Sequence, residues 1–403
     1  MDVVKKKRGL VLGGGGARGM YEIGAWIAFQ SCGIHFDVVS GTSIGALVGA
    51  MYTQQSLKLL LEFVYHLSPE QIVTDMVDPI YDWQDVVKNK QELFDLFKSY
   101  VRDGLDVSPL RSEIERMFDW DAFMASNIDF ACMTYSVDAH RGVPFYKEDF
   151  TRENAVDILM ASASCFPAFP MAQIEGKTYI DGGYADNLPV SLALDMGAEE
   201  VYVVDVHGIG LVRFVDSDCK QFRFEPLLPM GHVLDFSQKN GVRTLEMGYF
   251  ETMKFLGEYC GYMYSFDVQD WSEMYMVEQY LKLKFIEKDV DVIANLMDSV
   301  FGYRVANLNN RFSSDYFFGK WVECLAWICE LDAVRLWRYD EFLRVLNVKL
   351  SQKKGDTLSQ FYHILVRNQG VYPLYVEAIK SLHLTSYYLA YVWYFLSVYL
   401  KRA

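Results

Sequence analysis

The feature that most restricts the fold of this chain is Gly-Thr-Ser-Ile-Gly at residues 41–45, which lies between a short apolar run and a helix of small residues. Gly-x-Ser-x-Gly in this context is typical of a nucleophile elbow, a tight strand-to-helix turn that exposes the serine at the end of a sheet. Gly41 and Gly45 leave room for such a turn. The motif favours an α/β fold with Ser43 as a nucleophile. A plain turn in which Thr42 or Ser43 caps the helix also fits these residues.

A second glycine cluster, at residues 13–19, ends the first expected strand. Its spacing matches the dinucleotide-binding pattern, but those folds need an acidic residue at the end of the second strand, whereas Asp37 lies at its start. A P-loop is excluded because Gly-Lys-Ser/Thr is absent. Consecutive glycines before a helix instead free several backbone N–H groups to form an oxyanion hole. Arg18 in this run would brace the loop, lie near a substrate phosphate, or form an ordinary surface or structural ion pair.

Ser43 needs a proton acceptor, and the residues leave two alternatives open. His207 follows an apolar run and, with Asp181, would complete the chain order Ser, Asp, His of the α/β-hydrolases. Alternatively, Asp181, which is followed by Gly182 and Gly183, contacts Ser43 directly. Desolvation would raise the pKa of this carboxyl above its usual ~3.9 and make it a better base. Asp-Gly is also a common turn dipeptide.

Composition narrows the class of protein. The chain has 403 residues, of which 51% are hydrophobic, and its formal net charge of −15 argues against nucleic acid and against tight docking to an anionic membrane. Its seven cysteines form no CxxC pair, so neither a zinc site nor a disulfide framework is expected. We find no signal peptide, and a cytoplasmic location fits best.

The order of elements indicates two domains. Apolar runs alternate with helical spacing through the first seventy residues, which predicts a doubly wound, mostly parallel sheet. We expect a catalytic domain at 1–212 and a mainly α-helical, aromatic-rich region at 213–403. Strands are expected at 9–12, 36–40, 130–135, 177–180 and 201–206, and helices at 20–29, 43–51, 57–67 and 155–162, with 70–126 mostly helical.

The C-terminal stretch 381–400 carries no formal charge and is long enough to span a membrane. Tyrosines along its whole length favour a helix that is covered by protein. An interfacial or partner-binding helix, and a transmembrane helix, are the alternatives. This region would cap the site, bind lipid or form a homodimer.

Three motifs in this order resemble the patatin-like phospholipases. They are the glycine loop at 14–19, the elbow at 41–45 and Asp-Gly-Gly at 181–183. The segment 161–170 also resembles the family's Ala-Ser-x-x-x-Pro block, with Met171 where a second proline is frequent. The resemblance covers about residues 8–210.

The resemblance implies a patatin-like three-layer α/β/α fold and a Ser-Asp dyad without histidine. It also implies hydrolysis of acyl esters of phospholipids or related lipids, with no metal or cofactor. The partner is then a lipid or fatty-acyl ester, with peripheral membrane contact. A non-enzymatic lipid- or partner-binding protein of the same fold is the alternative. The implied site consists of the nucleophile Ser43, the base Asp181, the oxyanion-hole residues Gly14, Gly15, Gly16 and Ile44, and the supporting residues Arg18, Gly41, Gly45, Gly182 and Gly183.

Overall fold

The chain forms two compact units, Met1–Tyr249 and Phe250–Ala403. The computed structural model describes residues 6–74, 105–285, 316–373, 376 and 380–401. The division comes later than the boundary expected at residue 212, because a further strand and a long helix of the first unit lie beyond that residue.

Within the described residues, the first unit is built on an eight-stranded sheet in the order β5-β6-β3-β2-β1-β7-β8, with β4 also paired to β3. The centre, from β3 to β8, is parallel, and β4, β5 and β6 are antiparallel additions. This confirms the expected α/β fold with a mostly parallel sheet. The strands are β1 (Arg8–Leu12), β2 (Val38–Thr42), β3 (Asp129–Ser136), β4 (Arg141–Tyr146), β5 (Ala172–Ile174), β6 (Lys177–Asp181), β7 (Glu200–Val204) and β8 (Lys220–Phe224).

The helices of this unit confirm most of the spacing read from the sequence. The region 70–126 is helical in part, and its segment 75–104 lies outside the described residues. The helices are α1 (Met20–Ser31), α2 (Ile44–Thr53), α3 (Leu57–Tyr65), α6 (Ser108–Met117), α7 (Trp120–Ala125), α8 (Ala155–Ser162), α9 (Val190–Asp195) and α10 (Gln238–Leu256), in which the division falls.

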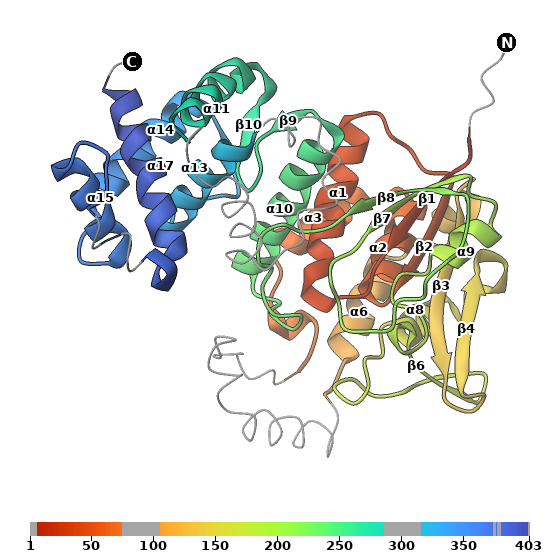
Figure 1. Ribbon diagram of the computed structural model, residues 1–403. Coiled ribbons are helices and arrows are strands. Elements are labelled where there is room, and N and C mark those ends of the chain that lie inside the picture. The colour runs from red at the N-terminus through yellow and green to blue at the C-terminus, as the bar shows by residue number, and fades with distance from the viewer. Residues whose placement is uncertain (1–5, 75–104, 286–315, 374–375, 377–379, 402–403) are drawn as a thin grey trace, which may run out of the picture. The chain divides into compact units, whose positions relative to one another are not determined.

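Alternating side chains of the central strands make the sheet the middle of three layers (Figure 1). Val11 and Val38 are fully buried in a cluster with residues of α9. The next residues, Leu12 and Val39, face the opposite way and lie close to Gly49 of α2. Successive side chains of a strand point to opposite faces, so helices are needed on both sides to bury these runs. Each such side chain contributes roughly 1.5–3 kcal/mol by its burial.

β8 is a strand within the region after residue 213 that was expected to be mainly helical. It pairs in parallel with β7, and Phe224 packs edge-on against Phe29 of α1 at a centroid distance of 4.9 Å. Phe222 and Phe224 alternate with polar residues, which is the period of a half-buried strand. A pattern of five residues with two aromatic side chains is too short to be recognised as a strand from the sequence alone. It is recognisable only once β7 is known to offer a free edge.

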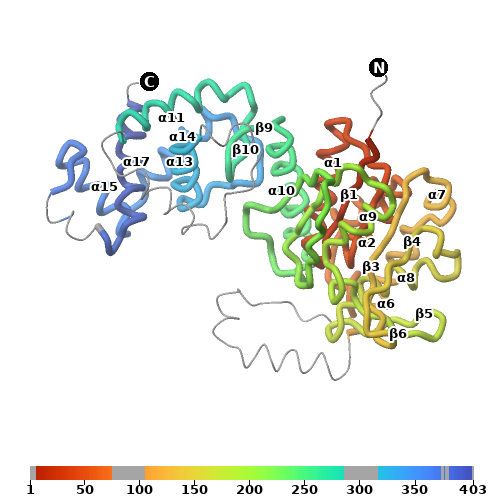
Figure 2. Tube along the Cα trace, turned by 45° about the vertical axis from the view of Figure 1, so that its right-hand side comes forward, coloured from red at the N-terminus to blue at the C-terminus, as the bar shows by residue number. Residues whose placement is uncertain are grey.

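The second unit is mainly helical, with a small sheet in its described part. The long helix α17 packs against α11, α13 and α15, and α15 and α17 lie side by side in Figure 2. Tyr387, Tyr391 and Trp393 of α17 are buried, which agrees with a helix covered by protein. Among the described residues, no helix combines the length and apolar character needed to cross a bilayer. The elements are β9 (Tyr259–Cys260), β10 (Ser265–Asp267), α11 (Trp271–Phe285), α13 (Phe317–Ile328), β11 (Leu336–Trp337), α14 (Tyr339–Gln352), α15 (Thr357–Arg367) and α17 (Leu384–Leu400).

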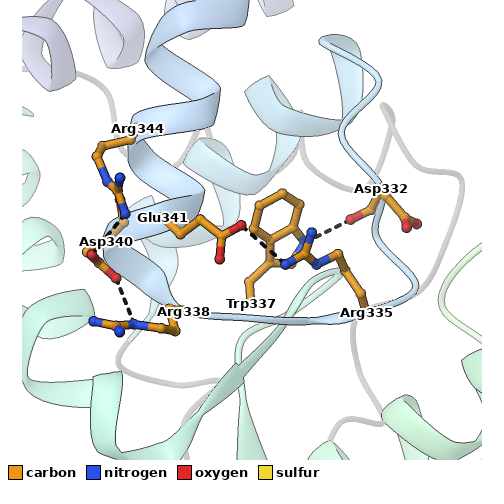
Figure 3. Close-up of polar contacts among 7 residues, drawn as sticks. All are labelled: Asp332, Arg335, Trp337, Arg338, Asp340, Glu341 and Arg344. Carbon is orange, nitrogen blue, oxygen red and sulfur yellow. Dashed lines mark hydrogen bonds and ion pairs between the residues drawn. The ribbon is translucent and has the colours of Figure 1, made fainter.

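Three arginines on the surface of this unit form ion pairs with carboxylates (Figure 3). Arg335 lies over the ring of Trp337 at 4.0 Å and forms an ion pair with Glu341 at 3.2 Å. Asp340, in the first turn of α14, accepts contacts from two further arginines, Arg338 and Arg344, at 3.2 Å each. Because these side chains are largely exposed, each pair contributes little to stability. The arginines of this cluster are therefore already paired with carboxylates and do not form a basic patch that would bind an anionic ligand.

Candidate active site

Ser43 occupies a sharp turn between β2 and α2. Its backbone angles are φ 57° and ψ −128°, a conformation that costs a non-glycine residue about 1–3 kcal/mol. A Cβ on Gly41 would lie 2.3 Å from the carbonyl oxygen of Gly45, and a Cβ on Gly45 would lie 2.4 Å from that of Leu12. Only glycine therefore fits on either side of the serine. The turn has the geometry that a nucleophile elbow requires.

A buried serine from α8 holds the elbow in place. Ser162 Oγ accepts a hydrogen bond from the Ser43 backbone N–H at 3.0 Å and donates one to the Met133 carbonyl at 2.8 Å. The hydroxyl thus links the turn to β3. Ser162 lies in the segment whose resemblance to the family was noted, but no role was assigned to it from the sequence.

The register of β3 brings Asp181 to Ser43. Strand β3 pairs with β2 up to Met133, which lies opposite Thr42. From the next residue, Thr134, β3 pairs with β6, and Thr134 lies opposite Asp181. The residue after Thr42 and the carboxyl end of β6 therefore lie at the same point of the sheet. The Asp181 N–H also donates to the Ser164 carbonyl at 2.8 Å, which fixes the end of β6.

The Asp181 carboxylate is nearly enclosed by the protein. It accepts a hydrogen bond from the Gly183 N–H at 2.7 Å, and the Ser43 side chain lies close enough to lower its pKa. Burial raises the pKa of Asp181 to about 6, and its interactions with the Ser43 side chain and the Gly183 N–H oppose that rise. The group is therefore ionised at neutral pH and more basic than an ordinary aspartate.

The glycine loop meets the elbow because β1 and β2 are parallel neighbours in register, with Leu12 opposite Gly41. The N–H of Gly14 donates to the Asn187 carbonyl at 3.2 Å, so this expected oxyanion donor is already occupied. The N–H groups of Gly15, Gly16 and Ile44 have no acceptor among the described residues. All three residues line the same cavity as Ser43 and Asp181.

Gly16 has φ +56°, and a Cβ there would lie 2.1 Å from the Val233 carbonyl oxygen, so only glycine fits. Asn187 makes a second contact with the loop, since its Nδ2 donates to the Gly14 carbonyl at 3.1 Å. Asn187 was not identified from the sequence, and it lies 173 residues from the glycine it contacts. Nothing in its local pattern indicates this role.

Arg18 braces the glycine loop, which is one of the roles expected for it. Its Nε donates to the Gly231 carbonyl at 3.0 Å and its Nη1 to the His207 carbonyl at 2.7 Å. Gly182 has no room for a side chain, because a Cβ would lie 2.2 Å from the Met133 carbonyl oxygen. The imidazole of His207 is partly exposed and faces Asp205, with Nδ1 3.8 Å from a carboxylate oxygen, rather than Asp181.

An apolar cavity of about 450 Å³ opens next to the Ser43–Asp181 pair. Its size lies within the range of about 300–1,000 Å³ for small-molecule sites, and its walls suit a hydrocarbon chain rather than a polar ligand. No group of three histidine, cysteine or acidic side chains in the described part of the chain could hold a metal ion. The apolar wall includes Met20, Ile23, Leu47, Val48, Met51, Leu60, Phe63, Ile72, Leu110, Ile114, Met117, Leu159, Phe169 and Phe236.

Comparison with known proteins shows the family that the first unit resembles. The family model for the patatin-like phospholipases matches residues 10–194. Lysophospholipase NTE1 of Mycosarcoma maydis is 31% identical over 207 residues, covering 50% of this chain and 10% of that protein. The protein of the same name from Yarrowia lipolytica is 32% identical over 207 residues, covering 50% of this chain and 13% of that protein.

The match therefore spans only about a tenth of the length of these relatives. Among solved structures, VipD from Legionella pneumophila is similar with a TM-score of 0.40 and 13% identity, over 97% of this chain and 90% of that one. This similarity is too low to support an argument. The family match, the order of the three motifs and the sheet show that residues 10–194 form a domain of the patatin-like phospholipase family.

Proposed function

We propose that the protein is a serine lipid acyl hydrolase in which Ser43 and Asp181 form the catalytic dyad. The observation that carries this proposal is that the Ser43 side chain lies beside the buried carboxylate of Asp181 at the edge of an apolar cavity. A nucleophile and its base within hydrogen-bond reach are the requirement for covalent catalysis. The substrate class is an acyl ester of a phospholipid or related lipid, whose hydrocarbon chain enters the cavity.

In the first half-reaction, Ser43 Oγ attacks the ester carbonyl carbon while Asp181 accepts the hydroxyl proton. A pKa of about 6 leaves most of the Asp181 carboxylate ionised at pH 7, so the base is ready without a histidine. The negative charge on the carbonyl oxygen is received by the N–H groups of Gly15, Gly16 and Ile44. These donors are fixed in place before the substrate arrives.

Collapse of the tetrahedral intermediate breaks the bond to the alcohol oxygen, which takes the proton from Asp181 and leaves. The acyl group is then held as an ester of Ser43. A water molecule gives its proton to Asp181 and attacks the acyl carbon, and Ser43 regains a proton from Asp181 as the fatty acid leaves. Asp181 is the only proton carrier that these reaction steps need.

The relatives' name supports a choice of first substrate. Both fungal relatives are called lysophospholipases, and the family model matches residues 10–194, which include Ser43 and Asp181. We therefore propose single-chain phospholipids as the class to test first, with two-chain phospholipids and neutral glycerides beside them.

The test is fatty-acid release from this lipid panel by the whole chain and three variants. Ser43→Ala and Asp181→Asn are each expected to lower kcat/KM by about 10³-fold or more, because each removes a member of a unit that acts together. His207→Ala is the matched control and keeps its activity. Full activity in either dyad variant, with folding unchanged, would overturn the proposal. Lipid binding by wild-type protein without any hydrolysis would favour the non-enzymatic alternative.

A further inference from the structure

The loop that follows β7 exposes apolar side chains beside the cavity. Phe214 is 92% exposed, Ile209 85%, Leu211 62% and Val212 53%. Exposed apolar residues scattered singly are normal, but a group in one loop indicates an interaction surface. This loop therefore presents an apolar surface that neighbouring residues of the chain do not cover and that another molecule could bind.

This loop is fixed at the mouth of the cavity. The Leu211 N–H donates to the Gly183 carbonyl at 2.8 Å, and the Leu211 carbonyl accepts from the Asn187 N–H at 2.5 Å. Arg213 Nε donates to the Ala185 carbonyl at 2.9 Å. The loop thus follows the segment that begins directly after Asp181. Ile209 and Leu211 line the cavity while remaining exposed, so the apolar surface continues into it.

A second segment extends the apolar surface at the mouth. Tyr184 lines the cavity and is exposed, and its hydroxyl donates to the carbonyl of Phe166, which is exposed as well. Nine large apolar side chains are exposed in the described residues of the first unit, and six of them belong to the loop after β7 or to the Tyr184–Phe166 pair. We call these six the mouth rim: Phe166, Tyr184, Ile209, Leu211, Val212 and Phe214.

The charges within the loop of the mouth rim do not favour attraction to an anionic surface. The loop and its flanks, residues 205–218, carry Asp205, Asp216 and Asp218 against a single arginine, Arg213. The whole chain has a net charge of −15. A partner held by the rim must therefore be drawn by apolar contact rather than by opposite charge.

We propose that the mouth rim docks the protein on a zwitterionic lipid surface by inserting apolar side chains at the boundary between head groups and acyl chains. This rests on the proposed function, because the cavity behind the rim then receives the acyl chain of a lipid in that surface. A substrate moves from the bilayer into the cavity along Ile209 and Leu211 without exposing its chain to water. The rim is thus a lipid-docking surface and not a contact for a nucleic acid or an acidic lipid.

The test uses Val212→Ser combined with Phe214→Ser, two rim residues that do not line the cavity. The control is Leu283→Ser combined with Val348→Ser, which are 68% and 54% exposed in the second unit. Each pair is placed in the whole chain, with and without Ser43→Ala. Sedimentation with phosphatidylcholine vesicles measures binding, and hydrolysis is compared between vesicle lipid and a water-soluble short-chain ester.

The rim variant is expected to bind vesicles about tenfold or more weakly, because each apolar side chain withdrawn from lipid loses its transfer free energy. Vesicle hydrolysis falls by a similar factor, while the soluble ester is hydrolysed as before. Wild-type and control proteins bind alike, with or without Ser43→Ala, and salt has little effect.

Four results would overturn the inference. They are equal vesicle binding by rim and control variants, no binding of wild type to phosphatidylcholine, binding that needs anionic lipid and disappears in salt, or self-association that only the rim variant loses. Failure of the proposed function has a different signature. Wild type then hydrolyses neither ester, while the rim variant still binds vesicles more weakly than the control.

Discussion

Replacing Ser162 with alanine tests whether the elbow is held from outside its own motif. The side chain is fully buried and makes two hydrogen bonds, to the Ser43 N–H and to the Met133 carbonyl. Each bond contributes about 0.5–1.5 kcal/mol net, and alanine returns at most about 0.5 kcal/mol through its higher helix propensity at the end of α8. We expect the free energy of unfolding to fall by about 1–2 kcal/mol.

The same change is expected to lower kcat more than stability alone explains. Ser43 is held in a strained conformation, and without its N–H partner the turn relaxes and its hydroxyl moves away from Asp181. Misplacement of a reacting group by about 1 Å costs up to 10²-fold in rate. We therefore expect kcat for a soluble ester to fall between about tenfold and 10²-fold. Thermal unfolding of the first unit shifts down by roughly 2–8 °C at this domain size.

Ser164→Ala is the matched control for this experiment. Ser164 is also buried, lies two residues further along, and its hydroxyl donates to the Met160 carbonyl at 2.8 Å within its own turn. Its backbone carbonyl, which holds Asp181, is unchanged by the substitution. The control loses less stability and keeps its kcat. If Ser162→Ala had wild-type kcat at a temperature where it is folded, the proposed support of the elbow would be refuted.

Three further predictions concern titration and the glycine loop. Because Asp181 must be ionised to act as the base and burial raises its pKa to about 6, kcat/KM should fall as pH drops through about 6, in wild type and in His207→Ala alike, in a pH–rate profile. Burial and the nearby Asp205 raise the pKa of Glu22 well above 4.5, so its contribution to stability is full below pH 4.5 and is lost as pH rises through the folded-state pKa. The free energy of unfolding of Glu22→Gln, measured with denaturant at several pH values, should therefore rise relative to that of wild type toward neutral pH. A difference between the two proteins that does not change with pH would contradict this. Gly16→Ala should lose most activity in the ester assay, because its Cβ has no space against the Val233 carbonyl and φ is +56°.

Local motifs made much of the site predictable. Gly41 and Gly45 encode the turn because no other residue fits its backbone. Asp181 was identified as the base only through the resemblance of the three motifs to the family, because Asp-Gly alone also indicates a plain turn. The alternation of strands and helices likewise indicated the sheet, since the buried runs need cover on both faces. These features depend on residues close together in the chain.

The parts that the sequence did not reveal depend on distant contacts. Gly14 is a plausible oxyanion donor by its position, yet its N–H is taken by Asn187, far along the chain. Ser162 supports the elbow from α8, and β8 exists as a strand because β7 provides an edge for it. In each case a partner more than a dozen residues away decides the outcome, and no local pattern carries that information.

The central claim is that Ser43 is acylated during turnover, and trapping the acyl-enzyme tests it most directly. The whole chain would be mixed with an activated fatty-acyl ester, quenched with acid within the first turnovers, and analysed by intact mass and peptide mapping. We expect one added acyl group, located on Ser43, which is absent in Ser43→Ala and greatly reduced in Asp181→Asn. Ester hydrolysis without any acyl group on Ser43, or with the acyl group on another residue, would contradict the account.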